Sequence, residues 1–304
     1  MTGGEYKMIK NRNIAKNAGI DPAKIAGGVG FHDIRETRYV CPSSSGVYQF
    51  LRNSVDNSML YTSLLAANTA SSAFDRIIIY PGDYDEGAVI PITVEGLQII
   101  GPGNMNQHQA MVYSSTASHH LITVNAHHVL IDGVGFTQTK DTYSGIMSST
   151  TASYHKLTIR NCRFDGYGAG EYAIHTGTTY DTPDIVIEDN RFHSWQTSAI
   201  YDNATRSVVR RNLIHTVAAK NGIEHVPTGG NRPGSFIVDN DILGVNSTDV
   251  GIAVGAVNAG CVHIARNYVS GAATTISQFA NGQYSGSMNY AADGSGGALI
   301  DIDS

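Results

Sequence analysis

The sequence is organised by a six-residue pattern seen in Ile187-Glu-Asp-Asn-Arg-Phe192, where an aliphatic residue precedes a large apolar one by five positions. Five more segments share it: Ile131-Asp-Gly-Val-Gly-Phe136, Ile159-Arg-Asn-Cys-Arg-Phe164, Val209-Arg-Arg-Asn-Leu-Ile214, Ile237-Val-Asp-Asn-Asp-Ile242 and Ile264-Ala-Arg-Asn-Tyr-Val269. The first aliphatic residue recurs at steps of 28, 28, 22, 28 and 27 residues. Such a period is typical of a solenoid, because no single unit can bury its own apolar face. The pattern therefore predicts stacked coils.

A second predicted strand precedes most of these repeats. In each case a small residue stands directly before an isoleucine: Ser144-Gly-Ile146, Tyr172-Ala-Ile174, Ser198-Ala-Ile200, Asn221-Gly-Ile223 and Val250-Gly-Ile252. Further β-rich runs occur near residues 76–80, 97–100 and 121–124. We therefore predict an all-β chain in which a parallel β-helix covers residues 76–282.

The two ends differ from the repeats. Residues 1–45 have too few apolar positions for a core, so they form either a disordered tail or an arm that orders on a partner. Residues 46–75 are predicted to be a helical cap, with one short amphipathic helix in the segment from Val55 to Ala67, where Asp56-Asn-Ser58 is of the capping type. Residues 283–304, rich in Gly, Ser and Asp, are predicted to cap the last coil or to pair with a neighbouring chain.

The charge distribution limits the partners. The formal net charge of the 304 residues is -6. Eight basic and five acidic residues give residues 1–56 a charge of +3, while twelve basic and 21 acidic residues give the remainder -9. An acidic body argues against nucleic-acid binding, and against polyanionic sugars unless a metal intervenes. The sequence also predicts no membrane insertion, and no export signal behind Met1.

The strands quoted above, with Ile77-Ile-Ile-Tyr-Pro-Gly-Asp-Tyr-Asp-Glu86 and Leu97-Gln-Ile-Ile-Gly-Pro-Gly103, resemble the pectin-lyase-like right-handed parallel β-helix superfamily. The resemblance covers about residues 75–280 and implies a single-stranded right-handed β-helix. It implies no one activity, because the superfamily includes lyases, hydrolases, epimerases, adhesins and phage tailspikes.

The predicted arm carries a second resemblance. Residues 11–25 are similar to short N-terminal segments of bacteriophage fibre and virion proteins, which implies a homotrimer attached to the particle by this segment. The residues that would make the attachment are Asn11, Ile14, Ala18, Ile20 and Ile25.

Stacking the repeats in register predicts two columns with structural roles. The first contains Val134 and Cys162 and continues as four asparagines, Asn190, Asn212, Asn240 and Asn267, whose side-chain amides can bond to one another. The second contains Asp132, Arg160, Glu188 and Arg210, whose signs alternate, so it is expected to be a surface salt ladder rather than a sugar-binding groove.

One column contains side chains that could take part in acid–base catalysis. It follows the isoleucine of the second strand and contains Met147, His175, Tyr201, Glu224 and Ala253. A Tyr or His can remove a proton and a Glu can act as general acid, and Asp202 and His225 come next and could join them. The alternative is that these side chains only cover a β-face. No hydrolase motif, arginine-based lyase pattern, metal signature or cofactor motif is visible.

These observations favour a structural virion protein, namely a spike, head fibre or capsid decoration on the virion surface. It would be made in the host cytoplasm and attached to other virion proteins through its arm, and host surface polysaccharide is an expected partner. The alternative is a phage polysaccharide depolymerase, either a lyase or a glycoside hydrolase. A bacterial surface adhesin is a third reading, disfavoured by the absence of an export signal.

Overall fold

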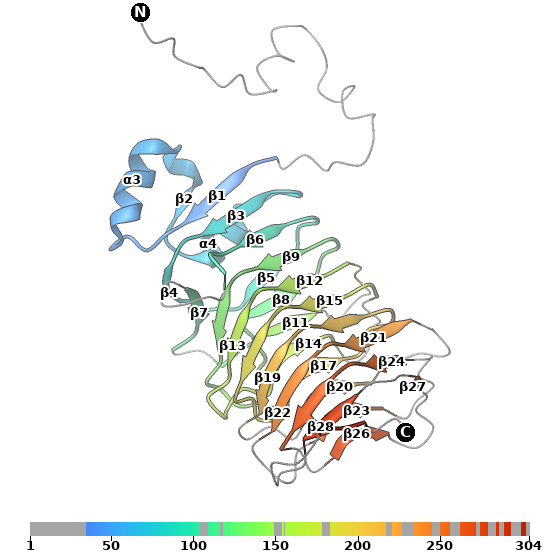
Figure 1. Cartoon of the computed structure of the whole chain (residues 1–304). Coiled ribbons are helices and arrows are strands. Elements are labelled where there is room, and N and C mark those ends of the chain that lie inside the picture. Colours follow the sequence, from blue (N-terminus) through green and yellow to red (C-terminus); the bar gives the residue numbers. More distant parts are fainter. Residues whose placement is uncertain are drawn as a thin grey trace, which may run out of the picture. The chain divides into compact units, whose positions relative to one another are not determined.

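Three sheets run along a right-handed parallel β-helix (Figure 1). The computed structural model describes residues 35–103, 109–115, 118–148, 154, 156–177, 183–216, 221–226, 234–244, 250–255, 262–271, 274–278, 284–285, 289–292 and 299–301. The five residues named for the predicted attachment arm, from Asn11 to Ile25, lie outside these ranges.

Sheet A contains, in spatial order, β2 (Leu60–Tyr61), β1 (Thr37–Val40), β3 (Arg76–Ile79), β6 (Gln98–Ile100), β9 (Leu130–Asp132), β12 (Thr158–Arg160), β15 (Val186–Glu188), β18 (Val208–Arg210), β21 (Ser235–Val238), β24 (Val262–Ala265) and β27 (Tyr284–Ser285). Sheet B contains β4 (Gly82–Asp85), β7 (Ala110–Tyr113), β10 (Gly135–Thr137), β13 (Arg163–Asp165), β16 (Arg191–His193), β19 (Leu213–Thr216), β22 (Asp241–Gly244), β25 (Tyr268–Ser270), β28 (Tyr290–Ala292) and β29 (Leu299–Asp301). Sheet C contains β5 (Ile90–Ile92), β8 (Ile122–Val124), β11 (Ile146–Ser148), β14 (Tyr172–His175), β17 (Ser198–Asp202), β20 (Asn221–His225), β23 (Val250–Val254) and β26 (Thr274–Gln278).

The repeat pattern aligns across coils as predicted. Ile159, Ile187 and Val209 are paired in neighbouring strands of sheet A and are fully buried. Their partners five positions later stack in sheet B, where the ring centroids of Phe164 and Phe192 lie 5.0 Å apart. The core is therefore a continuous column of apolar side chains, and each coil depends on its neighbours for burial.

The N-terminal end differs from the prediction in two ways. The strand β1 lies within the predicted arm and pairs in parallel with β3, so the solenoid begins earlier than residue 76. The single helix predicted from Val55 to Ala67 is wrong. Instead α3 (Gly46–Ser54), the 3-10 turn η1 (Asn57–Met59), β2 and α4 (Leu64–Thr69) follow one another.

Local capping and pairing explain this division. Asp56 caps only the short turn η1, because Leu60 and Tyr61 pair with β1 in extended conformation. Ser63 begins a new helix by accepting a hydrogen bond from the amide of Ala66 at 3.0 Å. The buried carboxylate of Glu86 accepts from the amide of Leu64 at 2.6 Å, which fixes α4 to the first coils. In the described part of the chain no helix is long and apolar enough to cross a membrane.

At the C-terminal end β29 pairs antiparallel with β28, so the last strand of sheet B reverses direction. Within the predicted tail, β28 in turn pairs in parallel with β25.

An asparagine column lies inside the turn between sheets A and B. The side-chain amide of each asparagine donates to the side-chain oxygen of the next, and the N···O distances are 3.1 Å from Asn190 to Asn212, 3.0 Å from Asn212 to Asn240 and 2.9 Å from Asn240 to Asn267. Asn289 continues the column beyond Asn267 at 2.9 Å. All five side chains are buried, so these contacts satisfy polar groups that water cannot reach.

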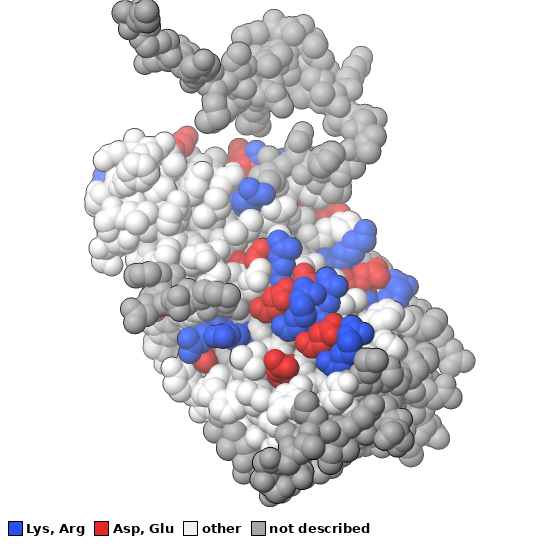
Figure 2. Space-filling view, viewed as in Figure 1, with Lys and Arg blue, Asp and Glu red and all other residues white. Residues whose placement is uncertain are grey.

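The outer face of sheet A carries paired charges (Figure 2). Arg160 contacts Asp132 at 2.8 Å, and Arg210 contacts Glu188 at 2.7 Å. The four residues are those of the column predicted to alternate in sign. Each pair is partly exposed, so it adds at most about 1 kcal/mol, but it neutralises this face.

Candidate functional site

The column of candidate acid–base residues lies on the outer face of sheet C. Met147, His175, Tyr201, Glu224 and Ala253 are in register on five successive strands, from β11 to β23. The isoleucines that precede them point into the core and are fully or almost fully buried. Strand alternation therefore places His175, Tyr201 and Glu224 side by side on the outside of the helix.

An additional tyrosine completes an aromatic cluster there. The ring centroids of Tyr172 and Tyr201 each lie 4.8 Å from that of His175, and the two tyrosines are 5.2 Å apart. Simple alternation would place Tyr172 and His175 on opposite faces, because they are three positions apart. In β14, however, Tyr172, Ile174 and His175 pair with residues of β17 and Ala173 does not. This irregularity interrupts the alternation, so the rings of Tyr172 and His175 both face outward.

The small residues before the isoleucines, such as Ala173, lie where the strands of sheet C bend and depart from simple alternation. A Cβ on Gly222 would lie 2.7 Å from a methyl of Ile242, and one on Gly145 would lie 2.9 Å from the carbonyl oxygen of Ala173. These positions therefore face the interior and take only small residues. The recurring small residue was the sequence signal for the bend, and with it Tyr172 could have been placed.

Polar groups surround the rings. The carboxylate of Glu224 accepts hydrogen bonds from the hydroxyl of Ser198 and from the side-chain amide of Asn221, both at 3.1 Å. Burial raises the pKa of Tyr172, and the nearby carboxylates of Glu171 and Glu224 raise it further. Sequence reasoning missed Glu171. It directly precedes β14, and burial raises its pKa.

His175 is held as a neutral ring. Burial lowers its pKa to about 4, with a smaller contribution from His120. Its side chain is 9% exposed, and neither ring nitrogen has a hydrogen-bond partner among the described residues. Burial also raises the pKa of Tyr201, and Glu224 adds to the effect. A histidine of such low pKa is a weak base at neutral pH, and the two phenols stay protonated, so this cluster is poorly suited to removing a proton.

The stability of the protein should fall in acid partly because of His175. In the unfolded chain this histidine takes up a proton near pH 6.5, whereas the folded state resists it until about pH 4. The unfolded state therefore binds more protons between these values, and folding loses up to about 3 kcal/mol as the pH falls through this window.

Replacing His175 with phenylalanine keeps a ring in the cluster and removes the titration. Denaturant unfolding at several pH values should give a shallower decline for this variant between pH 6.5 and 4 than for the wild type. Other groups titrate equally in both proteins, so parallel curves would contradict the assignment.

Asp202 and His225 do not join the column, which corrects the prediction. Both side chains point into the solenoid, at 0% and 1% exposure, because they occupy the alternate positions of β17 and β20. The Asp202 carboxylate contacts Nδ1 of His225 at 2.8 Å and the hydroxyl of Ser207 at 2.5 Å. Asp202 and Glu224 therefore cannot act together on one glycosidic bond.

Among the described residues, no basic side chain bonds to the aromatic cluster. Arg206 pairs with Asp184 at 2.8 Å, and Lys220 lies outside the described ranges. In the described part of the chain no Arg or Lys hydrogen-bonds to Tyr172, His175, Tyr201 or Glu224. The described residues also contain no group of three or more His, Cys, Asp or Glu that could hold a metal ion.

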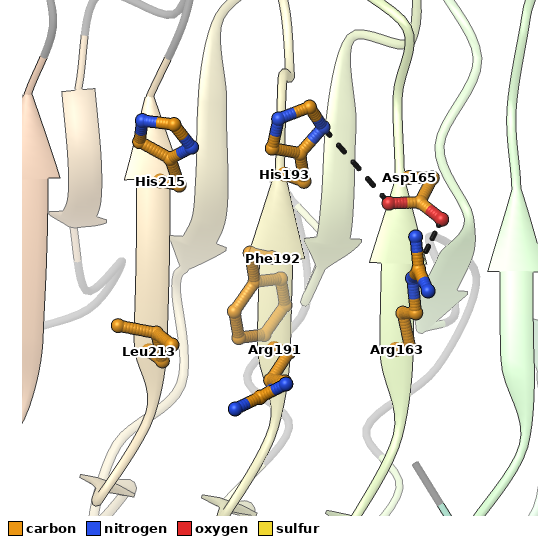
Figure 3. A pocket seen from close by; sticks show the side chains of 7 residues that line it. All are labelled: Arg163, Asp165, Arg191, Phe192, His193, Leu213 and His215. Atoms are coloured by element: carbon orange, nitrogen blue, oxygen red, sulfur yellow. Dashed lines mark ion pairs between the residues drawn. The ribbon is translucent and has the colours of Figure 1, made fainter. Parts of the chain in front are cut away.

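A separate hollow of about 320 Å³ lies on the outer face of sheet B (Figure 3). It is lined by residues of β13, β16 and β19: Arg163, Asp165, Arg191, Phe192, His193, Leu213 and His215. Arg163 and Asp165 form an ion pair of 2.8 Å, and the rings of His193 and His215 have centroids 5.2 Å apart. Of these residues the sequence pattern identified only Phe192, as an apolar position of the repeat, and none was predicted to bind a ligand.

Known proteins resemble the chain in fold. No family model and no curated protein matches the sequence. A pectin methylesterase solved with a hexasaccharide is 12% identical with a TM-score of 0.60, and the match covers 90% of this chain and 92% of that one. Pectin methylesterase PemA from Erwinia chrysanthemi is 11% identical with a TM-score of 0.59, and the match covers 89% of this chain and 92% of that one.

A third similar structure is a PL6 family alginate lyase, AlyGC, at 14% identity and a TM-score of 0.60. The match covers 87% of this chain but only 40% of the lyase. These likenesses establish the parallel β-helix fold. The identities are too low to transfer an activity.

Proposed function

We propose that this chain is a polysaccharide-binding β-helix of a bacteriophage particle, and that the outer face of sheet C holds the sugar chain. The observation that carries the proposal is the cluster of Tyr172, His175 and Tyr201 beside the carboxylate of Glu224. The half-buried rings of Tyr172 and Tyr201, packed on the buried His175, can offer flat apolar surface to the C–H faces of sugars, and a carboxylate accepts hydrogen bonds from their hydroxyls.

Two further observations support binding rather than turnover. The ring groups of the cluster remain neutral, and no described basic residue hydrogen-bonds to it. A lyase needs Arg, Lys or a metal to neutralise a uronate before the neighbouring proton becomes acidic. The parallel strands also repeat the surface at about 4.8 Å per coil, which suits an extended ligand.

The virion role rests on residues 11–25, whose resemblance to phage attachment segments is independent of the body. We propose that the arm joins a homotrimer to other virion proteins at the particle surface, as a spike, head fibre or capsid decoration. Imaging the native phage with an antibody against the β-helix tests this, and a label absent from every particle would reject it.

Glycan binding is tested by calorimetric titration of the full chain with capsular and exopolysaccharides of the host. The double variant Tyr172→Ala, Tyr201→Ala should bind about tenfold more weakly, because it removes the apolar surface that would contact the sugar, and burying about 60 Å² of apolar surface contributes roughly 1.5 kcal/mol. Tyr48→Ala in α3 is the matched control and should bind normally. Equal affinity of the double variant and the control would place binding elsewhere.

A glycoside hydrolase is the second candidate. Glu171 and Glu224 both act on the pKa of Tyr172, and burial raises the pKa of Glu171, as expected for a general acid. Reducing ends and unsaturated products should be followed during incubation with host polysaccharide. Turnover that disappears in Glu171→Gln and Glu224→Gln would replace the binding proposal with this one.

A further inference from the structure

We propose that the hollow on sheet B is an oxyanion-binding subsite for an anionic group carried on a sugar: a carboxylate, phosphate or sulfate. This deepens the proposed function and rests on it only in taking the ligand to be a glycan. The hollow lies on a different sheet from the aromatic cluster, so the two sites can be tested separately.

Arg191 is the residue that would bind the anionic group. The other arginines that face outward along these coils are occupied: Arg163 by Asp165, Arg210 by Glu188, and Arg211 by Asp189. Arg191 has no carboxylate within ion-pair distance among the described residues, and it lines the hollow (Figure 3). A guanidinium presents a planar fork of donors that matches two oxygens of a carboxylate or phosphate.

Asp165 organises the basic groups without closing the site. Its side chain is 7% exposed, whereas those of Arg163 and His193 are 49% and 54% exposed. It holds Arg163 at 2.8 Å and lies 4.0 Å from Nδ1 of His193. The negative charge therefore lies beneath the surface and is matched by Arg163, which leaves Arg191 and His215 to meet a ligand, while His193 keeps its long contact with Asp165.

The remaining lining suits a sugar. His193 and His215 are in register on neighbouring strands, and Figure 3 shows both rings side by side above Arg191 and Leu213. Each ring can donate an N–H, while Leu213 supplies an apolar patch for sugar carbons. The volume is at the lower end of the range of about 300–1,000 Å³ for small-ligand sites.

Neighbouring charges limit the site to isolated anionic groups. Asp241 follows Leu213 in register on the next strand, so the basic hollow ends there. The chain beyond residue 56 has a charge of -9, which repels a dense polyanion. We therefore expect a glycan with single, spaced acidic substituents.

The test is an NMR titration of the full chain that follows the imidazole C–H signals of His193 and His215, assigned with His→Gln variants. The probes are glucuronate, glucose 6-phosphate and glucose 6-sulfate, with glucose as the neutral control. At least one anionic probe should shift both signals saturably. Arg191→Gln should weaken that binding at least tenfold, Arg191→Lys should restore part of it, and Arg266→Gln, directly after β24, should leave it unchanged.

Equal shifts with glucose and the anionic probes, or no saturable shift with any of them, would overturn the subsite. If polysaccharide binding still depended on Tyr172 and Tyr201, the proposed function would stand without it. Saturable binding of an anionic probe in a chain that binds no polysaccharide would have the opposite meaning: the oxyanion site would stand and the proposed function would fail.

Discussion

Replacing Asp202 with alanine is expected to lower the free energy of unfolding by about 3–5 kcal/mol. The carboxylate is fully buried and accepts hydrogen bonds from the Ala204 amide at 3.0 Å and from Ser207, and it contacts His225 at 2.8 Å. Its removal leaves these groups unpaired in the core, where each unpaired group costs about 1–3 kcal/mol.

The measurement is equilibrium unfolding in guanidinium chloride, with Glu224→Gln as the control. Glu224 is half-buried on the outer face, and a glutamine keeps an oxygen for Ser198 and Asn221, so the control should change by less than about 1 kcal/mol. The result also separates structure from catalysis. An Asp202→Ala protein of unchanged stability that lost turnover of a polysaccharide would show that the carboxylate acts on substrate.

The fold was predictable because its signal is repeated. The successive strands of sheet A from Ile77 to Ile264 each supply an aliphatic residue equivalent to Ile187. One register therefore buries all of these residues, and any other register would bury fewer apolar groups. The N-terminal end has no repeat to average over. There the apolar residues around Leu60 have helical spacing, but Leu60 and Tyr61 form a strand because they pair with β1. Sequence periodicity does not reveal such a contact between separate segments.

The candidate sites were predictable only where strand alternation holds. It placed His175, Tyr201 and Glu224 in one column, but the bend at Ala173 shifted Tyr172 to the same face. Alternation also implies that Asp202 turns inward, a step that the sequence prediction did not take. The hollow on sheet B could not be found from the repeat. Arg191 differs from neighbouring arginines such as Arg163 only in having no carboxylate partner among the described residues, and the sequence does not show such pairing.

Replacing Asn212 with alanine should lower the free energy of unfolding by at least about 3 kcal/mol, because several buried groups lose their partner together. The Asn212 side chain donates to the carbonyl of Ile187 at 3.0 Å and to Asn240 at 3.0 Å. Its oxygen accepts from the backbone and the side-chain amide of Asn190, both at 3.1 Å.

The loss should also be local, which gives the prediction a second measurement. The backbone amide of Asn190 is left without its acceptor, so its hydrogen exchange should accelerate more than that of Asn267, which keeps its bond to Asn289. Asn53→Ala in the exposed part of α3 is the control and should change stability by less than about 0.5 kcal/mol. If Asn212→Ala were as stable as this control, the asparagine column would be a consequence of coil stacking and would not contribute to the stability of the fold.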